Sequence, residues 1–115
     1  MASEDGCLFC RIVAGDVPAE IVKIGERVVA FRDVNPQAPL HTLVVPRDHH
    51  EDVAALAAAD PQALAELVEV AQGLAASTGN GAYRLVFNSG AGAGQSVFHV
   101  HGHVLAGRPF GWPPG

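Results

Sequence analysis

The sequence predicts an α+β fold in which an antiparallel five-stranded sheet packs against one long helix. Two short runs rich in β-branched residues, Glu20–Ile24 and Arg27–Phe31, flank Gly25-Glu26, which is typical of a hairpin. Glycine and proline make up 21 of the 115 residues, above the typical ~12%, so many turns connect short elements. Hairpins combined with a single long helix favour an antiparallel sheet.

The N-terminal half predicts a short helix and three strands. Gly6–Ala14 is amphipathic and predicts a short helix that ends at Gly15. The hairpin supplies the first two strands. Asn35–Pro39 contains two prolines and predicts a stiff turn. The apolar run His41–Val45 then predicts a strand, which the following proline ends.

The long helix is predicted by its caps and by its apolar period. Asp60 is a favourable N-cap and Pro61 a favourable first helical residue. Gly79 or Gly81 can end the helix. The apolar residues that recur at three- and four-residue spacing, and so share one helical face, are Leu64, Leu67, Val68, Ala71, Leu74 and Ala75.

Two further strands complete the sheet. Tyr83–Asn88 and Phe98–Leu105 predict strands, and the glycine-rich segment Ser89–Ser96 connects them. The tail, Gly107–Gly115, contains three prolines and predicts irregular structure. We find no repeat and no linker, so residues 1–115 are expected to form a single domain.

Composition and charge restrict the class of partner. The formal net charge is −5, which disfavours a general nucleic-acid binder because such proteins need a basic surface. The longest apolar run, Val53–Ala59, is far shorter than the ~20 residues of a membrane helix. Met1–Asp5 is acidic and has no apolar signal core. We therefore expect a cytoplasmic protein without membrane contact.

Three histidines alternate with other residues in His99-Val100-His101-Gly102-His103. On a strand, His99, His101 and His103 point to one face, while Phe98, Val100 and Val104 point toward the helix. Same-face neighbours lie ~6.5–7 Å apart, so two imidazoles can serve one small ligand. Imidazole is a nucleophile and a proton carrier near neutral pH. A metal-binding strand and an accidental polar face are the alternatives.

The segment Asn88–Ser96 mixes glycines with hydroxyl and amide side chains. Glycines allow backbone N–H groups to approach an anion closely. No Gly-Lys-Ser/Thr follows, and the next element is a strand, which excludes a P-loop and a dinucleotide fingerprint. Beside the histidine strand, the segment predicts a phosphate cradle with Ser96 near the reacting group. A flexible hairpin loop is the alternative.

Four segments resemble the histidine triad (HIT) superfamily. His99–Leu105 resembles its H-φ-H-φ-H-φ-φ signature, with Gly102 at a usually bulkier position. Phe31–His41 resembles the nucleotide-binding segment of the Hint branch of nucleoside phosphoramidases. Gly94–Phe98 leads into the triad as it does there, and Trp112–Gly115 resembles the C-terminus of that branch. The resemblance covers nearly the whole chain.

This resemblance implies nucleotidyl transfer. His101 would attack the α-phosphorus of a nucleoside 5′-monophosphate derivative, and water would release the mononucleotide from the histidine. His103 and His41 would contact phosphate oxygens, and Ser96 would assist the leaving group. The other nucleotide contacts implied are Phe31, Asp33, Val34, Asn88, Gly94, Gln95 and Val97, with Phe9 or Ile12 as further base-pocket residues. Asp33 would accept the ribose hydroxyls, and Phe31 and Val34 would line the base pocket. Alternatively, Phe31 and Val34 are core residues, and Asp33 caps a turn.

Cys7 and Cys10 form a C-x-x-C pair, and no βαβ pattern surrounds them to indicate a thioredoxin-like role. Tetrahedral zinc takes four ligands, often Cys₂His₂. His49 and His99 are the best candidates for the other two ligands, and His50 can replace His49. The pair resembles that of Hint-like proteins that bind structural zinc. Two reduced thiols without metal are the alternative.

Three functions are compatible with these residues. The first is a purine nucleoside phosphoramidase that cleaves the P–N bond of AMP joined to an amine. The second is a diadenosine polyphosphate hydrolase of the fragile-histidine branch, which the sequence after the triad and the Trp-Pro-Pro tail make less favoured. The third is a non-catalytic, zinc-stabilised nucleotide-binding protein. The resemblance also implies a homodimer formed by the long helix and the last strand of the sheet.

Overall fold

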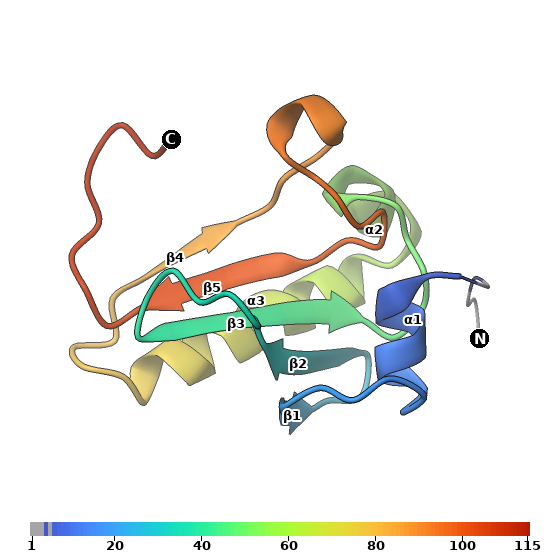
Figure 1. Cartoon of the computed structure of the whole chain (residues 1–115), viewed down its shortest axis with the longest axis horizontal. Coiled ribbons are helices and arrows are strands. Elements are labelled where there is room, and N and C mark those ends of the chain that lie inside the picture. The colour runs from blue at the N-terminus through green and yellow to red at the C-terminus, as the bar shows by residue number, and fades with distance from the viewer. Residues whose placement is uncertain (1–3, 5) are drawn as a thin grey trace.

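A computed structural model describes residues 4 and 6–115, and this part of the chain forms an α+β fold with one antiparallel sheet of five strands (Figure 1). The strand order is β1-β2-β3-β5-β4. The strands are β1 (Ile21–Ile24), β2 (Val28–Arg32), β3 (Leu40–Pro46), β4 (Tyr83–Val86) and β5 (Gly102–Ala106). The helices are α1 (Leu8–Val13), α2 (Val53–Ala59), α3 (Pro61–Ala76) and a 3₁₀ turn at Ala91–Ala93. The predicted fold class is confirmed.

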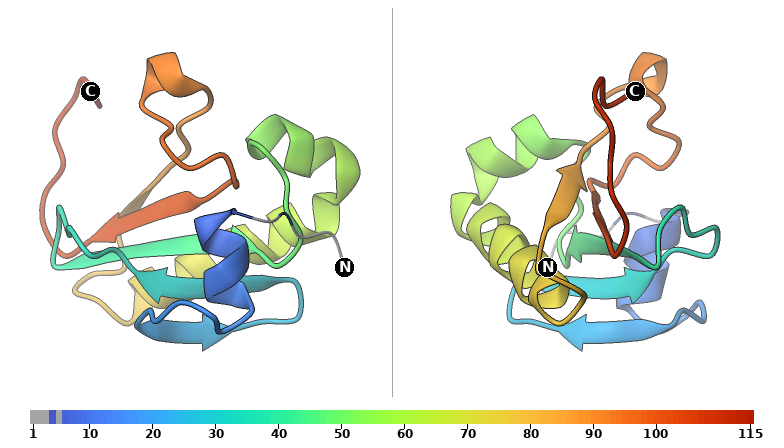
Figure 2. Two further views of the ribbon diagram at one scale, coloured as in Figure 1. Left: turned by 45° about the vertical axis from the view of Figure 1, so that its right-hand side comes forward. Right: turned by 90° about the vertical axis from the view of Figure 1, so that its left-hand side faces the viewer.

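Helices cover both faces of the sheet (Figure 2). The helices α2 and α3 lie on one face, and α1 lies on the other, over β2 and β3. Because successive strand residues point to opposite faces, β2 and β3 supply both cores. The core under α3 contains Val28, Ala30, Val44, Leu56, Ala63, Leu67, Ala71, Val100 and Val104. The core under α1 contains Phe9, Ile12, Val29, Phe31, Leu43 and Val45.

The helix α3 begins and ends close to where its sequence predicts. The Asp60 carboxylate accepts a hydrogen bond from the backbone N–H of Ala63 at 3.1 Å, and Pro61 is the first helical residue. The helix ends at Ala76, just before two glycines with positive φ. A further helix, α2, precedes it and is capped by Asp52. Its seven alanine-rich residues are too few to show a clear helical period.

The last strand differs from its prediction. β5 begins only at Gly102, so His99 and His101 precede the strand and lie on a bent segment. The N–H of Val100 donates to the carbonyl of His50 instead of joining a strand ladder. The expectation that Phe98 points toward the long helix is wrong, because this residue is 43% exposed and lines a hollow with Cys7 and Leu8. The strand predicted to end at Asn88 ends two residues earlier, at the end of β4.

Gly102, the first residue of β5, packs closely against α3 and β4. Neighbouring side chains fill the space that its own side chain would occupy. A Cβ atom here would lie 3.0, 3.1 and 3.2 Å from side-chain atoms of Leu85, Leu67 and Phe87. We therefore expect Gly102→Leu to lower the free energy of unfolding by ~1–3 kcal/mol through overpacking. Denaturant unfolding measures this. The matched control is Gly73→Ala, which meets open space on α3 and is expected to stabilise the helix. Unchanged stability of Gly102→Leu would contradict the packing argument.

In the described part of the chain, none of the helices has the length and apolar character needed to cross a bilayer. The expectation that Met1–Asp5 has no apolar signal core concerns mainly residues 1–3 and 5, which lie outside the described part.

Candidate active site and metal centre

A cavity of about 570 Å³ opens between α1 and the sheet face formed by β2, β3 and β5. Its polar lining includes His101, His103 and Ser96, and its apolar lining includes Phe9, Ile12 and Leu43. The other lining residues are Leu8, Pro18, Ala19, Glu20, Phe31, Arg32, Asp33, Val34 and Val97. The structure thus brings most of the predicted nucleotide contacts to one cavity.

The two aromatic or apolar residues expected at the base pocket have different surroundings. Phe31 is 3% exposed, so it is a core residue and also a wall of the cavity. Val34 lines the rim of the cavity and its side chain is fully exposed, so the alternative that Val34 is a core residue is wrong. Phe9 packs edge-on against Phe31 at 5.4 Å between ring centroids, which makes it a further wall.

The ring of His101 is held by the backbone just before it. Its Nδ1 lies 2.9 Å from the carbonyl oxygen of His99, and a carbonyl can only accept a hydrogen bond, so Nδ1 carries the proton. Nε2 of the neutral ring therefore keeps its lone pair. The ring of Phe9 packs edge-on against the same imidazole at 5.0 Å. His101 thus presents an oriented nucleophilic nitrogen beside the cavity.

His41 and His103 form a hydrogen-bonded chain whose direction the backbone sets. The N–H of Gln37 donates to Nδ1 of His41 at 2.9 Å, so the proton of a neutral His41 lies on Nε2. Nε2 of His41 lies 3.0 Å from Nδ1 of His103, and this Nδ1 accepts the hydrogen bond. The proton of His103 is therefore on Nε2. His103 can donate this N–H to an oxygen atom of a ligand in the cavity.

Asp33 joins this chain as well as capping a turn. Its Oδ1 accepts the N–H of Asn35 at 2.8 Å, so the turn-capping alternative is confirmed. Its Oδ2 lies 3.3 Å from Nε2 of His41 and 3.9 Å from Nδ1 of His103. These three atoms are close enough to hold a cation. The proton on Nε2 of His41 disfavours that use. Contact with ribose hydroxyls stays a prediction.

Burial keeps both histidines of the chain neutral. Burial lowers the pKa of His103 to about 4, helped by the nearby rings of His101 and His41 and opposed by the Asp33 carboxylate. Burial also lowers the pKa of His41, against the opposing effect of Asp33. A neutral His103 is what the hydrogen-bond chain requires, because its Nδ1 must accept.

This pKa predicts a loss of stability in acid. The unfolded chain binds a proton on His103 near the ordinary pKa of 6.5, whereas the folded chain binds it only near 4. Stability is therefore fully present above 6.5, and the free energy of unfolding falls as the pH is lowered from 6.5 toward 4. Denaturant unfolding at several pH values measures this. In His103→Gln the decline over the same interval should be shallower, and parallel curves for the two proteins would refute the prediction.

The glycine-rich segment is held by Gln95 rather than being free. The buried Gln95 side chain accepts the N–H of Gly90 at 2.9 Å and donates to the carbonyls of Glu51 and Val97 at 2.8 and 3.1 Å. These bonds use both N–H groups of the Gln95 amide, and Gln95 does not line the cavity, so its nucleotide contact stays a prediction. Asn88 and Gly94 lie beside each other but do not line the cavity, so their phosphate contacts stay predictions.

The second group of polar side chains joins both cysteines to two histidines. The Sγ atoms of Cys7 and Cys10 each lie 3.4 Å from Nδ1 of His99, and Cys10 Sγ lies 3.5 Å from Nδ1 of His49. All four ligand atoms lie within 4.8 Å of one another. The structure therefore selects His49 rather than His50 for this cluster.

The surroundings of both histidines suit metal ligation. Nε2 of His99 donates to the carbonyl of Pro46 at 2.8 Å, which leaves the lone pair of Nδ1 facing the sulfur atoms. Nε2 of His49 lies 3.2 Å from the Glu4 carboxylate. Burial lowers the pKa of His99 to about 4, so its ring is neutral, as a metal ligand must be. Burial raises the pKa of the Cys10 thiol, so this thiol would release a proton when a metal ion binds. Two sulfur and two nitrogen donors fit tetrahedral zinc.

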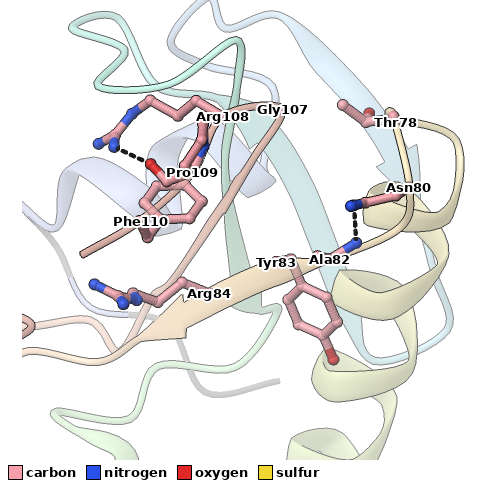
Figure 3. A pocket seen from close by; sticks show the side chains of 10 residues that line it. Thr78, Asn80, Ala82, Tyr83, Arg84, Gly107, Arg108, Pro109 and Phe110 are labelled. Carbon is pink, nitrogen blue, oxygen red and sulfur yellow. Dashed lines mark hydrogen bonds between the residues drawn. The ribbon is translucent and has the colours of Figure 1, made fainter. Parts of the chain in front are cut away.

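A second cavity, of about 590 Å³, lies beside the start of β4 and the chain just after β5. None of the predicted site residues line it. Figure 3 shows Phe110 between the guanidinium groups of Arg84 and Arg108, whose Cζ atoms lie 5.3 and 4.3 Å from the ring centroid. Arg84 also donates to the carbonyl of Gly111, and Arg108 donates to that of Gln37. These contacts anchor the C-terminal tail.

Comparison with known proteins decides the family. Residues 14–110 match the HIT domain. The chain belongs to the HIT family. An uncharacterised HIT-like protein of Synechocystis is 45% identical to this HIT protein over 109 residues, which cover 94% of this chain and 96% of that one. A maize protein described as a 14 kDa zinc-binding protein is 40% identical over 112 residues, covering 94% and 87% of the two chains.

Solved structures agree with this assignment. The crystal structure of a HIT family hydrolase from Legionella pneumophila superimposes on this HIT protein with a TM-score of 0.89 and 43% sequence identity, covering 96% of this chain and 100% of that one. A HIT family hydrolase from Clostridium thermocellum gives a TM-score of 0.88 and 36% identity, covering 95% and 96%. Both carry the same fold over nearly their whole length.

Several contacts of the two sites had no sequence signal. The carbonyls of His99 and Pro46 and the N–H of Gln37 fix which nitrogen of each histidine carries its proton. Such backbone groups are present in every residue, so a sequence does not mark them. Glu4 was also missed as the partner of His49, because nothing in the sequence relates residues so far apart.

Proposed function

We propose that this HIT protein is a nucleoside phosphoramidase of the Hint branch, which hydrolyses the P–N bond of AMP joined to an amine. The observation that carries the proposal is the pair of oriented imidazoles, His101 and His103, that line the cavity. His101 offers a lone pair at Nε2, and His103 offers an N–H. Their rings touch edge-on with centroids 5.0 Å apart, so both nitrogens can face the same phosphate group from one side of the cavity.

The orientation of His101 accounts for the first step. Nε2 attacks the α-phosphorus, the P–N bond breaks, and the amine leaves with a proton supplied through Ser96 or solvent. The carbonyl of His99 stabilises the positive charge that develops on the ring, because it accepts the Nδ1–H. His103 donates to a phosphoryl oxygen. A water molecule then attacks the phosphorus, which releases AMP and restores the neutral histidine.

The apolar part of the cavity supports a purine base. Phe9, Ile12, Phe31 and Leu43 lie together in the wall of the cavity. The flat face of a purine fits such surroundings because it buries apolar area without leaving a charged group unpaired. Asp33 at the same opening offers carboxylate oxygens to the ribose hydroxyls.

We also propose that Cys7, Cys10, His49 and His99 hold a structural zinc ion. When bound, zinc would cross-link α1 to the loop after β3 and to the segment before β5, and it would supply no chemistry to the reaction. The donor set supports zinc, and so does the zinc-binding description of the maize relative. Two neighbouring cysteines that are not joined in a disulfide favour a reducing compartment such as the cytoplasm.

A homodimer is proposed as the working form. β5, the last strand along the chain, lies inside the sheet, whereas β4 is at its edge. Val68 on α3 is 41% exposed, so β4 and α3 can meet a second copy. Trp112 on the tail is 84% exposed and also lacks cover within one chain. Sedimentation equilibrium should give twice the 11.9 kDa of the chain. A mass of one chain at micromolar concentration would reject the dimer.

The activity is tested by comparing two substrates. Turnover of adenosine 5′-phosphoramidate should greatly exceed turnover of diadenosine triphosphate, and the reverse order would favour a hydrolase of the fragile-histidine type. Acid quenching during turnover of a radiolabelled substrate should trap a nucleotide on the protein. AMP binding without turnover or trapping would favour the non-catalytic alternative.

A further inference from the structure

The helix α1 contributes to the metal cluster and to the nucleotide cavity at the same time. Cys7 and Cys10 supply the two sulfur atoms of the cluster. Leu8, Phe9 and Ile12, which lie next to these cysteines in the sequence, line the cavity. Movement of this six-residue helix would therefore change both sites together.

A second connection passes through His99. Its imidazole faces the two sulfur atoms, whereas its backbone carbonyl accepts the Nδ1–H of His101. Phe9 packs against both rings, with centroids 6.0 Å from His99 and 5.0 Å from His101. His99 and Phe9 thus connect the cluster to the ring of the proposed nucleophile.

The two thiols lie close enough together to be oxidised to a disulfide. Both are free cysteines, and their Sγ atoms lie within 4.8 Å. Cys7 is partly exposed, so an oxidant can reach it, and Cys10 is buried beside it. The N–H of Cys10 also donates to the sulfur of Cys7 at 3.4 Å, which holds this sulfur beside Cys10. A thiol that is reached first and a neighbour that resolves it are the two parts of a redox-sensitive pair.

We propose that Cys7 and Cys10 are a hydroperoxide-sensitive modification site. Their oxidation to a disulfide lowers the affinity of the cavity for its nucleotide. Hydrogen peroxide oxidises the Cys7 thiol to a sulfenic acid and is reduced to water. The Cys10 thiol then attacks this sulfur, the S–S bond forms, and a second water molecule leaves with the hydroxyl oxygen. Two thiols and one peroxide thus give one disulfide and two water molecules.

Oxidation removes the metal contacts that join α1 to His49 and His99. Formation of the bond brings the two sulfur atoms to ~2.0 Å and leaves both without the negative charge that metal ligation requires. His49 and His99 alone make a weak site, so a bound metal is released. His99 and Phe9 then lose the contacts that orient His101. This inference rests on the metal site and nucleotide site proposed above.

The test uses the full-length, metal-loaded protein before and after treatment with hydrogen peroxide. Mass spectrometry should show the loss of two hydrogen atoms, and a colorimetric chelator should show release of metal. Calorimetric titration should show AMP affinity reduced by roughly tenfold or more. The ¹⁵N signals of the His101 ring should shift. A dithiol reductant together with zinc should reverse all four changes.

The matched control is Cys7→His, which keeps four metal ligands but cannot form the disulfide. Its AMP affinity should not respond to peroxide. A wild-type disulfide that leaves AMP affinity and the His101 signals unchanged would overturn the proposal, and so would thiols that resist peroxide. If the reduced protein binds no AMP, the proposed function fails, whereas the His101 signals still decide the switch, supporting it if they shift on oxidation and overturning it if they do not.

Discussion

His101→Ala is expected to lower the turnover of adenosine 5′-phosphoramidate by about 10⁴-fold or more, because it removes the nucleophile itself. The cavity keeps its aromatic walls and His103, so AMP should still bind. The side chain of His101 donates a hydrogen bond to the carbonyl of buried His99, so its loss should lower the free energy of unfolding by about 1–3 kcal/mol and leave the protein folded. Steady-state kinetics, calorimetric titration with AMP and thermal unfolding give the three measurements.

The matched control for this variant is His50→Ala. The side chain of His50 belongs to neither the metal cluster nor the chain of Asp33, His41 and His103. Its turnover should therefore equal that of the wild type. Wild-type protein quenched during turnover should carry labelled nucleotide, and His101→Ala should carry none. Retained turnover in His101→Ala would refute the assignment of the nucleophile.

Cys10→Ser is expected to lose bound metal and to lower the melting temperature by roughly 15 °C or more. A tightly bound ion stabilises only the folded chain, and the four ligands come from three segments that are far apart in the sequence. Elemental analysis should find about one zinc ion per wild-type chain when no chelator is used during purification. Calorimetry measures the melting temperature of both proteins.

Arg11→Ala is the matched control for this variant, because Arg11 lies on the same helix, is exposed, and is outside the cluster. It should retain the metal and melt close to the wild type. Wild-type protein without zinc would contradict the metal site. A Cys10→Ser variant that melts with the wild type would show that the ion, if present, does not hold α1 in place.

Local patterns were sufficient for most of the framework. Gly25-Glu26 between two β-rich runs gave the hairpin, and Asp60-Pro61 gave the start of α3, because turns and caps depend on a few adjacent residues. The strand before Gly102 and the helix α2 were not predicted correctly. The segment before β5 looks like a strand by composition, but a hydrogen bond from Val100 to His50 takes it out of the ladder.

The sequence by itself determined which chemistry the chain carries: a cysteine pair, six histidines and a glycine-rich segment at fixed spacings. The sequence also indicated which histidines join the cysteines and which face the phosphate, but only the tertiary structure chose His49 over His50 and showed His41 within hydrogen-bond distance of His103. The tertiary structure also decided which ring nitrogen of each histidine carries its proton, because that depends on carbonyl and N–H groups that folding brings within hydrogen-bond distance. Residue types set what each group can do, whereas the folded backbone sets its direction.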